Sequence, residues 1–100
     1  MRATPLRPTV KSVLHLNLRR QWFAAIAAKT KRIEYRGQTP YWRKRLEGRH
    51  YDVIVFRNGY ARNAPEMEAE FRGLRRYGRG RDAYYAIRLG RIRWIKRWKP

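Results

Sequence analysis

The sequence predicts a small α+β fold, a mixed β-barrel of five or six strands with two short helices inserted early in the chain. Short apolar segments recur after residue 50 at a spacing that leaves no room for helical crossovers, so a doubly wound parallel sheet is not expected. Both helical patterns lie in the first half of the chain. A hydrophobic fraction of 43%, with 14% aromatic residues, is ample for one core in 100 residues. We therefore expect a single domain over residues 13–100.

The chain is expected to open with an arm, a strand and a helix. Residues 1–12 include Pro5 and Pro8 and show no periodicity, so they predict an N-terminal arm that is free to be loose. From residue 13 leucines alternate with other residues, which predicts a strand with its leucine face inward. A helix is expected at about 20–28, because four apolar residues recur at the spacing of one helical stripe. These residues are Trp22, Phe23, Ile26 and Ala27.

A second strand and a second helix follow. Residues 31–36 are predicted to form the strand, which Gly37 ends. Thr39 and Pro40 are the residue types preferred at the N-cap and the first position of a helix, so they predict the start of the second helix. This helix is expected to stop at Gly48.

The second half of the chain is predicted to contain only strands and turns. Residues 52–57 have the β-branched density of a central strand, and Asn58-Gly59 predicts a sharp turn after it. In residues 66–72 apolar and charged residues alternate, which predicts a strand with one wet face. Residues 73–80 are expected to be a basic, glycine-punctuated loop.

Two further strands are expected at the C-terminal end. One covers residues 84–89, and the last follows Gly90. Trp94 is expected in the core and Trp98 at the surface, in a basic aromatic end that provides a second contact strip.

The composition indicates a polyanion as the partner. There are 26 Lys and Arg against 7 Asp and Glu, a formal charge of +19, which is typical of nucleic-acid-binding proteins. The chain has no cysteine, which excludes disulfides and thiolate chemistry. It also has no signal-peptide run and nothing near the roughly 20 apolar residues of a membrane helix. We therefore expect a cytoplasmic protein that binds a nucleic acid, with no membrane and no obligatory protein partner.

Lys31 and Glu34 are the first candidates for catalysis. Burial and neighbouring cations lower the pKa of a lysine, so that it can move protons together with a carboxylate, while Arg36 steadies the developing anion. Positions 31 and 34 point to opposite faces of an ideal strand. A shared site therefore requires Lys31 to lie in the turn before the strand, or a bulge between them. The alternative is a surface ion pair.

Other carboxylates and the two histidines are further candidates. Glu70 is the one acid of its strand that we expect close to the cleft, and so a third catalytic candidate. The alternative is that Glu66, Glu68 and Glu70 neutralise neighbouring arginines. His15 and His50 would need carboxylates to complete a metal site, so neither a metal nor a cofactor is expected.

Aromatic residues interleave with arginines in the middle of the chain, the composition of a site that stacks bases and holds phosphates. The alternatives are core packing for Tyr41 and Trp42 and a plain hairpin turn for Asn58-Gly59. The candidate nucleic-acid-binding residues are Tyr35, Arg36, Tyr41, Trp42, Arg43, Arg57, Asn58, Tyr60, Arg62, Arg76 and Arg79.

Eight short segments, in order, resemble the ASCH domain (activating signal cointegrator homology), a relative of the PUA RNA-binding barrel. They are Leu16-Asn17-Leu18, Trp22-Phe23, Lys31-x-x-Glu34-x-Arg36, Pro40-Tyr41-Trp42, Arg45-Leu46, Asn58-Gly59-Tyr60, Ala64-Pro65 and Tyr85-Ala86-Ile87-x-Leu89-Gly90. The similarity runs from about residue 13 to residue 92. It implies a PUA-like barrel with helices near a cleft that binds RNA or a nucleoside derived from it.

The resemblance also implies two activities. Some members resemble ribonucleases, and others are amidohydrolases that remove the acetyl group of N4-acetylcytidine. In the latter the motif reads Lys-x-x-Thr-x-Arg, and here Glu34 stands at the threonine position, so the hydroxyl is missing. The expected function is RNA binding with metal-independent ribonuclease activity at Lys31 and Glu34. The alternatives are a nucleoside amidohydrolase, an RNA-binding module without catalysis, and a DNA-binding protein.

Overall fold

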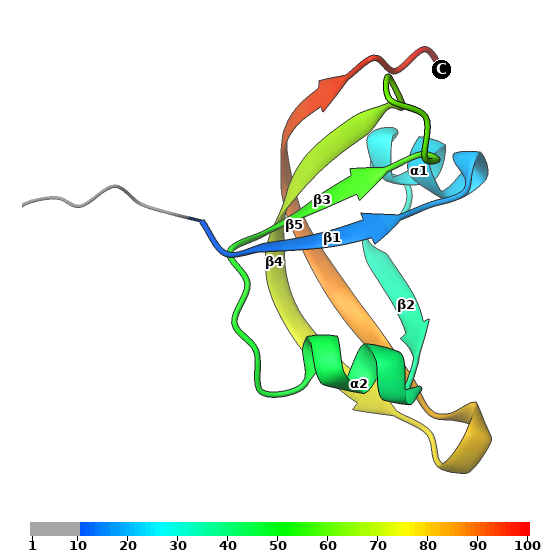
Figure 1. The fold of residues 1–100 in the computed structure, drawn as a ribbon, viewed down its shortest axis with the longest axis vertical. Helices are drawn as coiled ribbons and strands as arrows, with labels where there is room; N and C mark the ends of the chain where they lie inside the picture. The colour runs from blue at the N-terminus through cyan, green and yellow to red at the C-terminus, as the bar shows by residue number, and fades with distance from the viewer. Residues whose placement is uncertain (1–10) are drawn as a thin grey trace, which may run out of the picture.

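A computed structural model describes residues 11–100 as an α+β fold with five strands and two α-helices (Figure 1). The predicted arm, residues 1–12, lies mostly outside the described residues. Its last residue, Ser12, is held in place: its backbone N–H donates to Asp52 and its hydroxyl donates to the carbonyl of His50. The elements are β1 Val13–Asn17, α1 Arg20–Ala27, β2 Ile33–Gly37, α2 Pro40–Leu46, β3 Val53–Arg57, β4 Glu66–Tyr77, a 3-10 turn Gly80–Asp82 and β5 Tyr84–Lys96.

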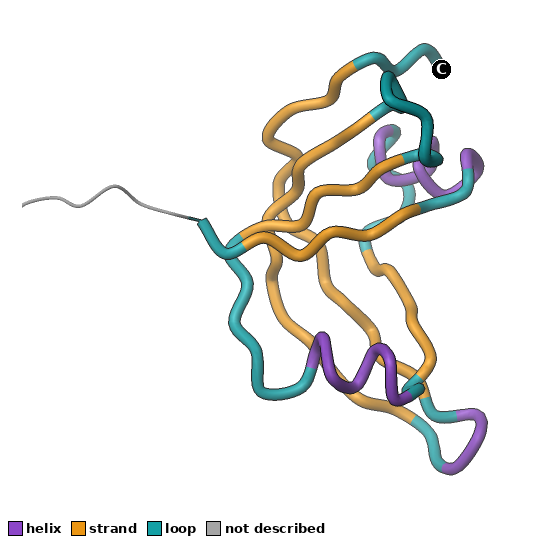
Figure 2. Tube along the Cα trace, in the orientation of Figure 1, coloured by secondary structure: helices purple, strands orange, loops and turns teal. Residues whose placement is uncertain are grey.

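The five strands form one mixed sheet in the order β1-β3-β4-β5-β2. β1 and β3 are parallel and all other neighbours are antiparallel. The sheet curls into a half-barrel, which Figure 2 shows as a curved layer of strands. Its edge strands β1 and β2 lie close to each other: Nη2 of Arg36 in β2 donates to the carbonyl of Asn17 in β1 at 3.0 Å. We call the gap between these two edges the seam.

Both helices cover the inner side of the sheet. α1 buries Phe23 and Ile26 against the core beside the ends of β1 and β2. α2 crosses the lower half of the half-barrel (Figure 1) and buries Leu46. The predicted start of α2 is confirmed, because the Thr39 hydroxyl accepts a hydrogen bond from the backbone N–H of Trp42 at 3.2 Å. The predicted leucine face of β1 is confirmed as well: Leu14, Leu16 and Leu18 are all buried.

Two predictions about the C-terminal half are wrong. Residues 73–77 continue β4 and do not form a loop, and residues 84–96 form one strand and not two. β-Bulges between Glu68 and Gly73 shift the register of the β4–β5 pair, so the two strands stay paired on both sides of the irregularity. Gly73 has a φ of +141°, which favours glycine within such a bulge. Gly90 lies over Glu70 and Arg72, where a side chain would collide with theirs.

Three predictions about exposure are also wrong. Glu68 lies on the face of β4 that was expected to be wet, but it is 6% exposed, because Lys11 and Arg93 cover and neutralise it. Trp98 is half-buried and not exposed, since its ring packs 4.8 Å from that of Phe23. Trp94, which was expected in the core, is half-buried with Lys96 over its ring. Within residues 11–100, no helix has the length and apolar character needed to cross a membrane.

Candidate nucleic-acid interface

Glu34 joins two cations from its buried place in β2. Its Oε1 lies 3.5 Å from Nζ of Lys31, and its Oε2 accepts from Nε of Arg36 at 2.9 Å and lies 2.7 Å from Nη2. Lys31 precedes β2, which begins at Ile33, so Lys31 reaches the carboxylate from the turn before the strand. The side chain of Glu34 is 8% exposed, against 16% for Lys31 and 18% for Arg36. This carboxylate therefore fixes the position of both cations.

A cleft of about 730 Å³ lies along the seam. The end of β1, Arg36 of β2, the first turn of α2 and the turn after β3 surround it. We call it the seam cleft; its lining residues are His15, Leu16, Asn17, Leu18, Arg19, Arg36, Tyr41, Trp42, Arg57, Asn58, Gly59 and Tyr60. The lining contains no carboxylate, so the cleft suits an anionic ligand.

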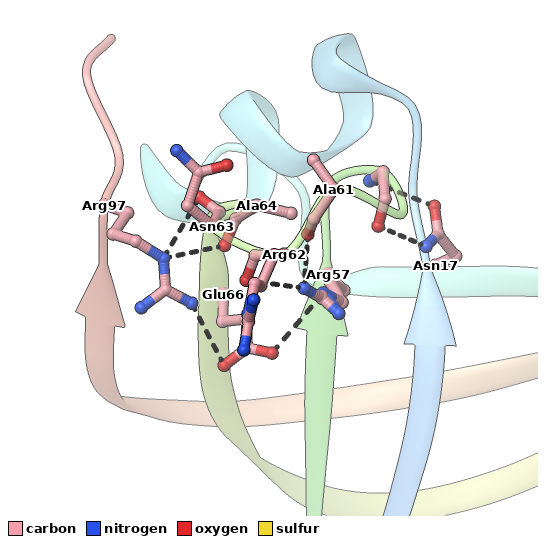
Figure 3. Close-up of polar contacts among 9 residues, drawn as sticks. Asn17, Arg57, Ala61, Arg62, Asn63, Ala64, Glu66 and Arg97 are labelled. Carbon is pink, nitrogen blue, oxygen red and sulfur yellow. Dashed lines mark hydrogen bonds and ion pairs between the residues drawn. The ribbon is translucent and has the colours of Figure 1, made fainter.

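Two asparagines hold the rim of the seam cleft. The side chain of Asn17 donates to the Gly59 carbonyl at 2.9 Å and accepts from the Gly59 N–H at 3.2 Å (Figure 3). The amide of Asn58 donates to the carbonyl of Leu18 at 3.0 Å. Gly59 has a φ of +100°, a conformation that side chains other than glycine rarely adopt. These bonds tie the turn after β3 to the end of β1 and so fix this side of the cleft.

Arg57 supports the loop beyond this rim. Its Nη2 donates to the carbonyls of Ala61 and Arg62, and its Nε lies 3.5 Å from Glu66 (Figure 3). Arg97 supports the same loop from the C-terminal end by donating to the carbonyls of Asn63 and Ala64. The Nη2 group of Arg57 is therefore committed to the loop, whereas its buried Nε has no hydrogen-bond partner within residues 11–100.

Aromatic rings supply the wall on the side of α2. The guanidinium of Arg36 lies 4.9 Å from the centre of the Trp42 ring, which is half-buried. Tyr41 is 54% exposed and carries the guanidinium of Arg45 on its face at 3.5 Å. Tyr60 is 88% exposed, so its ring is open to stacking on both faces. Core packing therefore accounts for part of Trp42 and for little of the two tyrosines.

The other predicted binding residues lie away from the seam cleft. Tyr35 is on the opposite face of β2, and Arg62 and Arg79 lie on exposed loops. Arg76 forms an ion pair with Glu47 at 3.2 Å, and Arg43 donates to the carbonyl of Gln38. The structure thus brings together six of the eleven predicted residues; these six are Arg36, Tyr41, Trp42, Arg57, Asn58 and Tyr60.

Shifted pKa values mark the acids that bind neighbouring groups. The buried Tyr85 hydroxyl donates to Glu47 at 2.6 Å and lowers the pKa of that carboxyl, with help from Arg76. Burial, and then Glu47, raises the pKa of the Tyr85 phenol. Glu70 accepts from the backbone N–H of Arg91 and from Arg72, which lower its pKa. Glu70 is therefore held as a carboxylate by the bulge in β5, and it does not line the seam cleft.

Sequence reasoning missed three residues of the cleft that carry polar chemistry, which are Arg19, His15 and the rim residue Asn17. Arg19, the residue before α1, lines the cleft, and within residues 11–100 its guanidinium forms no ion pair. No local pattern singles out one arginine among so many. His15 was expected only as a strand residue, but it lies on the exposed face of β1 beside the cleft. The alternation of β1 indicated that face, whereas the position of the seam could not be read from the chain.

No group of three or more metal-ligating side chains lies together within residues 11–100. Comparisons with protein-family models, with curated proteins and with solved structures find no match to this chain.

Proposed function

We propose that this chain is a cytoplasmic RNA-binding protein that receives a single-stranded or unpaired segment of RNA in the seam cleft. The observation that carries the proposal is the lining of that cleft, where aromatic rings and arginines meet without a carboxylate. Rings bind bases by stacking, and guanidinium groups bind phosphates. The net charge of +19 supplies attraction to a polyanion over the rest of the surface.

Each part of the cleft has a role in this proposal. Tyr60 and Tyr41, the exposed rings, stack on bases. Arg19 contacts a phosphate, because its guanidinium has no partner within residues 11–100. Arg36 is fixed by Glu34 and by the Asn17 carbonyl, so it contributes positive potential and holds the seam together. Asn58 uses its amide to hold the rim and is therefore a positioning residue.

We also propose that the half-barrel is a PUA-like domain of the ASCH type. The support is the coincidence of the motif residues with the cleft. Arg36 of the Lys-x-x-Glu-x-Arg motif, the Tyr41-Trp42 pair and the Asn58-Gly59-Tyr60 turn are distant in sequence and line one hollow. A chance similarity of short motifs would not require this convergence.

RNA binding by this mechanism must weaken steeply with salt. For three phosphate contacts to a single strand, the affinity falls by about 20-fold between 50 and 200 mM salt, since each contact contributes a slope of roughly −0.7. Fluorescence anisotropy with a labelled 12-nucleotide RNA measures this dependence. An affinity that does not change over this range contradicts the proposal. The same oligonucleotide as DNA must bind more weakly, and equal affinity would contradict the choice of RNA.

The double variant Arg19→Ala/Tyr60→Ala tests whether the cleft is the binding site. It removes one phosphate contact and one stacking ring, so RNA affinity is expected to fall by about tenfold or more. Arg49→Ala is the control for charge, because Arg49 is exposed and does not line the cleft. It is expected to change the affinity by less than about threefold. Equal losses in the two proteins would show that binding follows net charge and not the cleft.

Metal-independent hydrolysis of RNA, or of an acylated nucleoside, is a second candidate function. It is favoured by one contact, the 3.5 Å between Lys31 and Glu34. Glu34 itself does not line the cleft, so binding remains the first proposal. Incubation with total RNA and a chelator, followed by fragment sizing and nucleoside mass analysis, tests it. If the chain is a hydrolase, the natural protein forms product and Lys31→Gln forms none; no product from the natural chain would eliminate this function.

A further inference from the structure

Three exposed tyrosines form a row across three neighbouring strands. Tyr35 of β2 lies 5.8 Å from Tyr84 of β5, and Tyr84 lies 5.4 Å from Tyr77 of β4, measured between ring centres. The three side chains are 52%, 38% and 42% exposed respectively. A cross-strand pair explains why Tyr77 stacks on Tyr84. It does not explain why a third ring on another strand extends the row while all three stay open to solvent.

The tyrosine row lies on the outer face of the sheet, opposite the seam cleft. Arg36, Tyr85 and Arg76 are register partners, and they face inward toward α2 through Trp42 and Glu47. Because side chains alternate along a strand, the adjacent positions point outward. Figure 1 shows α2 on one side of the β4–β5 ribbon only. The outer face therefore has no helix over the tyrosine row.

A second hollow, of about 530 Å³, lies next to β2 and β5, beside the end of α1. Two of its lining residues, the register partners Ile33 and Arg88, are at outward positions of their strands, as Tyr35 and Tyr84 are. We call it the outer hollow; its lining residues are Ile26, Lys29, Lys31, Arg32, Ile33, Arg72, Arg88, Leu89, Gly90, Arg91 and Ile92. Six of these eleven residues are basic and none is acidic. Lys31 links the hollow to the row, since its ammonium lies 5.1 Å from the centre of the Tyr35 ring.

Two arginines on the same face as the tyrosine row extend this positive surface. Arg88 is the register partner of Ile33 and lines the outer hollow, and Arg75 is the partner of Ala86 between the tyrosines. Both are exposed, and neither forms an ion pair within residues 11–100. The backbone that carries two of the rings is held from the residue after β2, because the side chain of Gln38 donates to the carbonyl of Tyr84 at 2.9 Å and weakly to that of Tyr77. Rings that contact one another, beside cations that form no ion pair in the described part of the chain, form a stacking surface that is in place before a ligand binds.

We propose that this outer face is a second binding surface for single-stranded RNA. Two or three bases stack on Tyr35, Tyr84 and Tyr77, and the adjoining phosphates enter the outer hollow, where Arg88 and its neighbours bind them. The inference rests on the proposed function in taking RNA as the partner, but it uses no residue that lines the seam cleft. An RNA strand that binds both surfaces must pass around the edge strand β2. There Glu34 contacts Lys31, which lines the outer hollow, and Arg36, which lines the seam cleft.

The double variant Tyr77→Ala/Tyr84→Ala tests the stacking. Its affinity for a 12-nucleotide oligouridylate is expected to fall by about tenfold, the usual effect of removing base stacking. Tyr77→Phe/Tyr84→Phe keeps the rings and is the matched control, expected within about twofold of the natural chain. Arg75→Ala/Arg88→Ala changes only exposed cations. It replaces the first test if circular dichroism shows that Tyr77→Ala/Tyr84→Ala is unfolded. It must reduce the salt slope by about 0.7 for each phosphate that is no longer bound.

The cleft variant Arg19→Ala/Tyr60→Ala, measured with the same RNA, separates the two proposals. If the natural chain binds no RNA, the proposed function fails and this inference fails with it. If the cleft variant weakens binding while the tyrosine and Arg75/Arg88 variants bind as the natural chain does, only the outer surface is overturned. A tyrosine variant that keeps its RNA affinity but loses self-association in sedimentation would assign the row to an interface between copies, which also overturns the inference.

Discussion

Replacing Glu34 by alanine is expected to lower the free energy of unfolding by about 3 kcal/mol. Removing one partner from a buried ion pair costs about 3–5 kcal/mol, because the remaining charge is left in a poor solvent without compensation. Here two cations, Lys31 and Arg36, would be left, but their exposed fractions of 16% and 18% let water relieve part of the cost. We therefore expect the lower end of this range, measured by urea unfolding at pH 7.

Glu70→Ala is the control for this prediction. Glu70 likewise has two cationic partners, but the side chains of Arg72 and Arg93 are 58% and 39% exposed. Exposed ion pairs contribute about 0–1 kcal/mol, so Glu70→Ala is expected to be much milder. The triple variant Lys31→Met/Glu34→Leu/Arg36→Met should recover most of the stability, since apolar residues of similar volume replace a buried ion cluster well. A Glu34→Ala protein as stable as the natural chain would show that the cluster is solvated.

The position of Glu34 also bears on the function. Oε1 of Glu34 holds Lys31, which lines the outer hollow, and Oε2 holds Arg36, which lines the seam cleft. Glu34 itself lines neither hollow. The carboxylate is therefore better suited to position two cations than to attack a substrate. This geometry is why we propose RNA binding ahead of hydrolysis.

Local sequence signals predicted the first half of the fold well. The leucine alternation of β1, the helical stripe of α1 and the Thr39-Pro40 start of α2 each depend on neighbours in the chain, and the structure confirms all three. Side-chain alternation also indicated that Lys31 can meet Glu34 only from the turn before the strand or across a bulge. The predicted strand over residues 31–36 began too early, because β2 begins at Ile33 and Lys31 lies before it. Such features need no knowledge of which strand pairs with which.

Features that depend on pairing were missed. Glycines at positions 73 and 90 look like strand ends, but β4 and β5 pair over their whole length and accommodate them in bulges. Glu68 looks exposed by alternation, but Lys11 and Arg93 arrive from two other segments to bury it. The position of the seam decides which predicted residues line the cleft, and the strand order that creates it was not readable from the chain. Tyr35 was assigned to the same site as Arg36, although adjacent residues of a strand point to opposite faces, and it lies on the outer face.

Replacing Phe23 by alanine is expected to lower the free energy of unfolding by about 4 kcal/mol, within the range measured for buried phenylalanines. Phe23 is fully buried where α1 closes the upper part of the seam, and it packs on Trp98 at 4.8 Å. Arg20 adds to this contact, with its guanidinium 4.6 Å from the Trp98 ring and a hydrogen bond to the Lys99 carbonyl. A cavity at Phe23 therefore weakens both α1 and the C-terminal segment.

The neighbouring residue Trp22 supplies the matched control, because it lies on the same helix but is 45% exposed. Trp22→Ala removes a larger ring, yet it is expected to cost about 1 kcal/mol or less, since little of the removed surface is buried in the core. A domain of 100 residues has a total stability of about 5–15 kcal/mol, so the Phe23 variant should unfold at a markedly lower urea concentration. Equal losses of stability for the two variants would mean that α1 is held by its whole surface and not by the aromatic contact with Trp98.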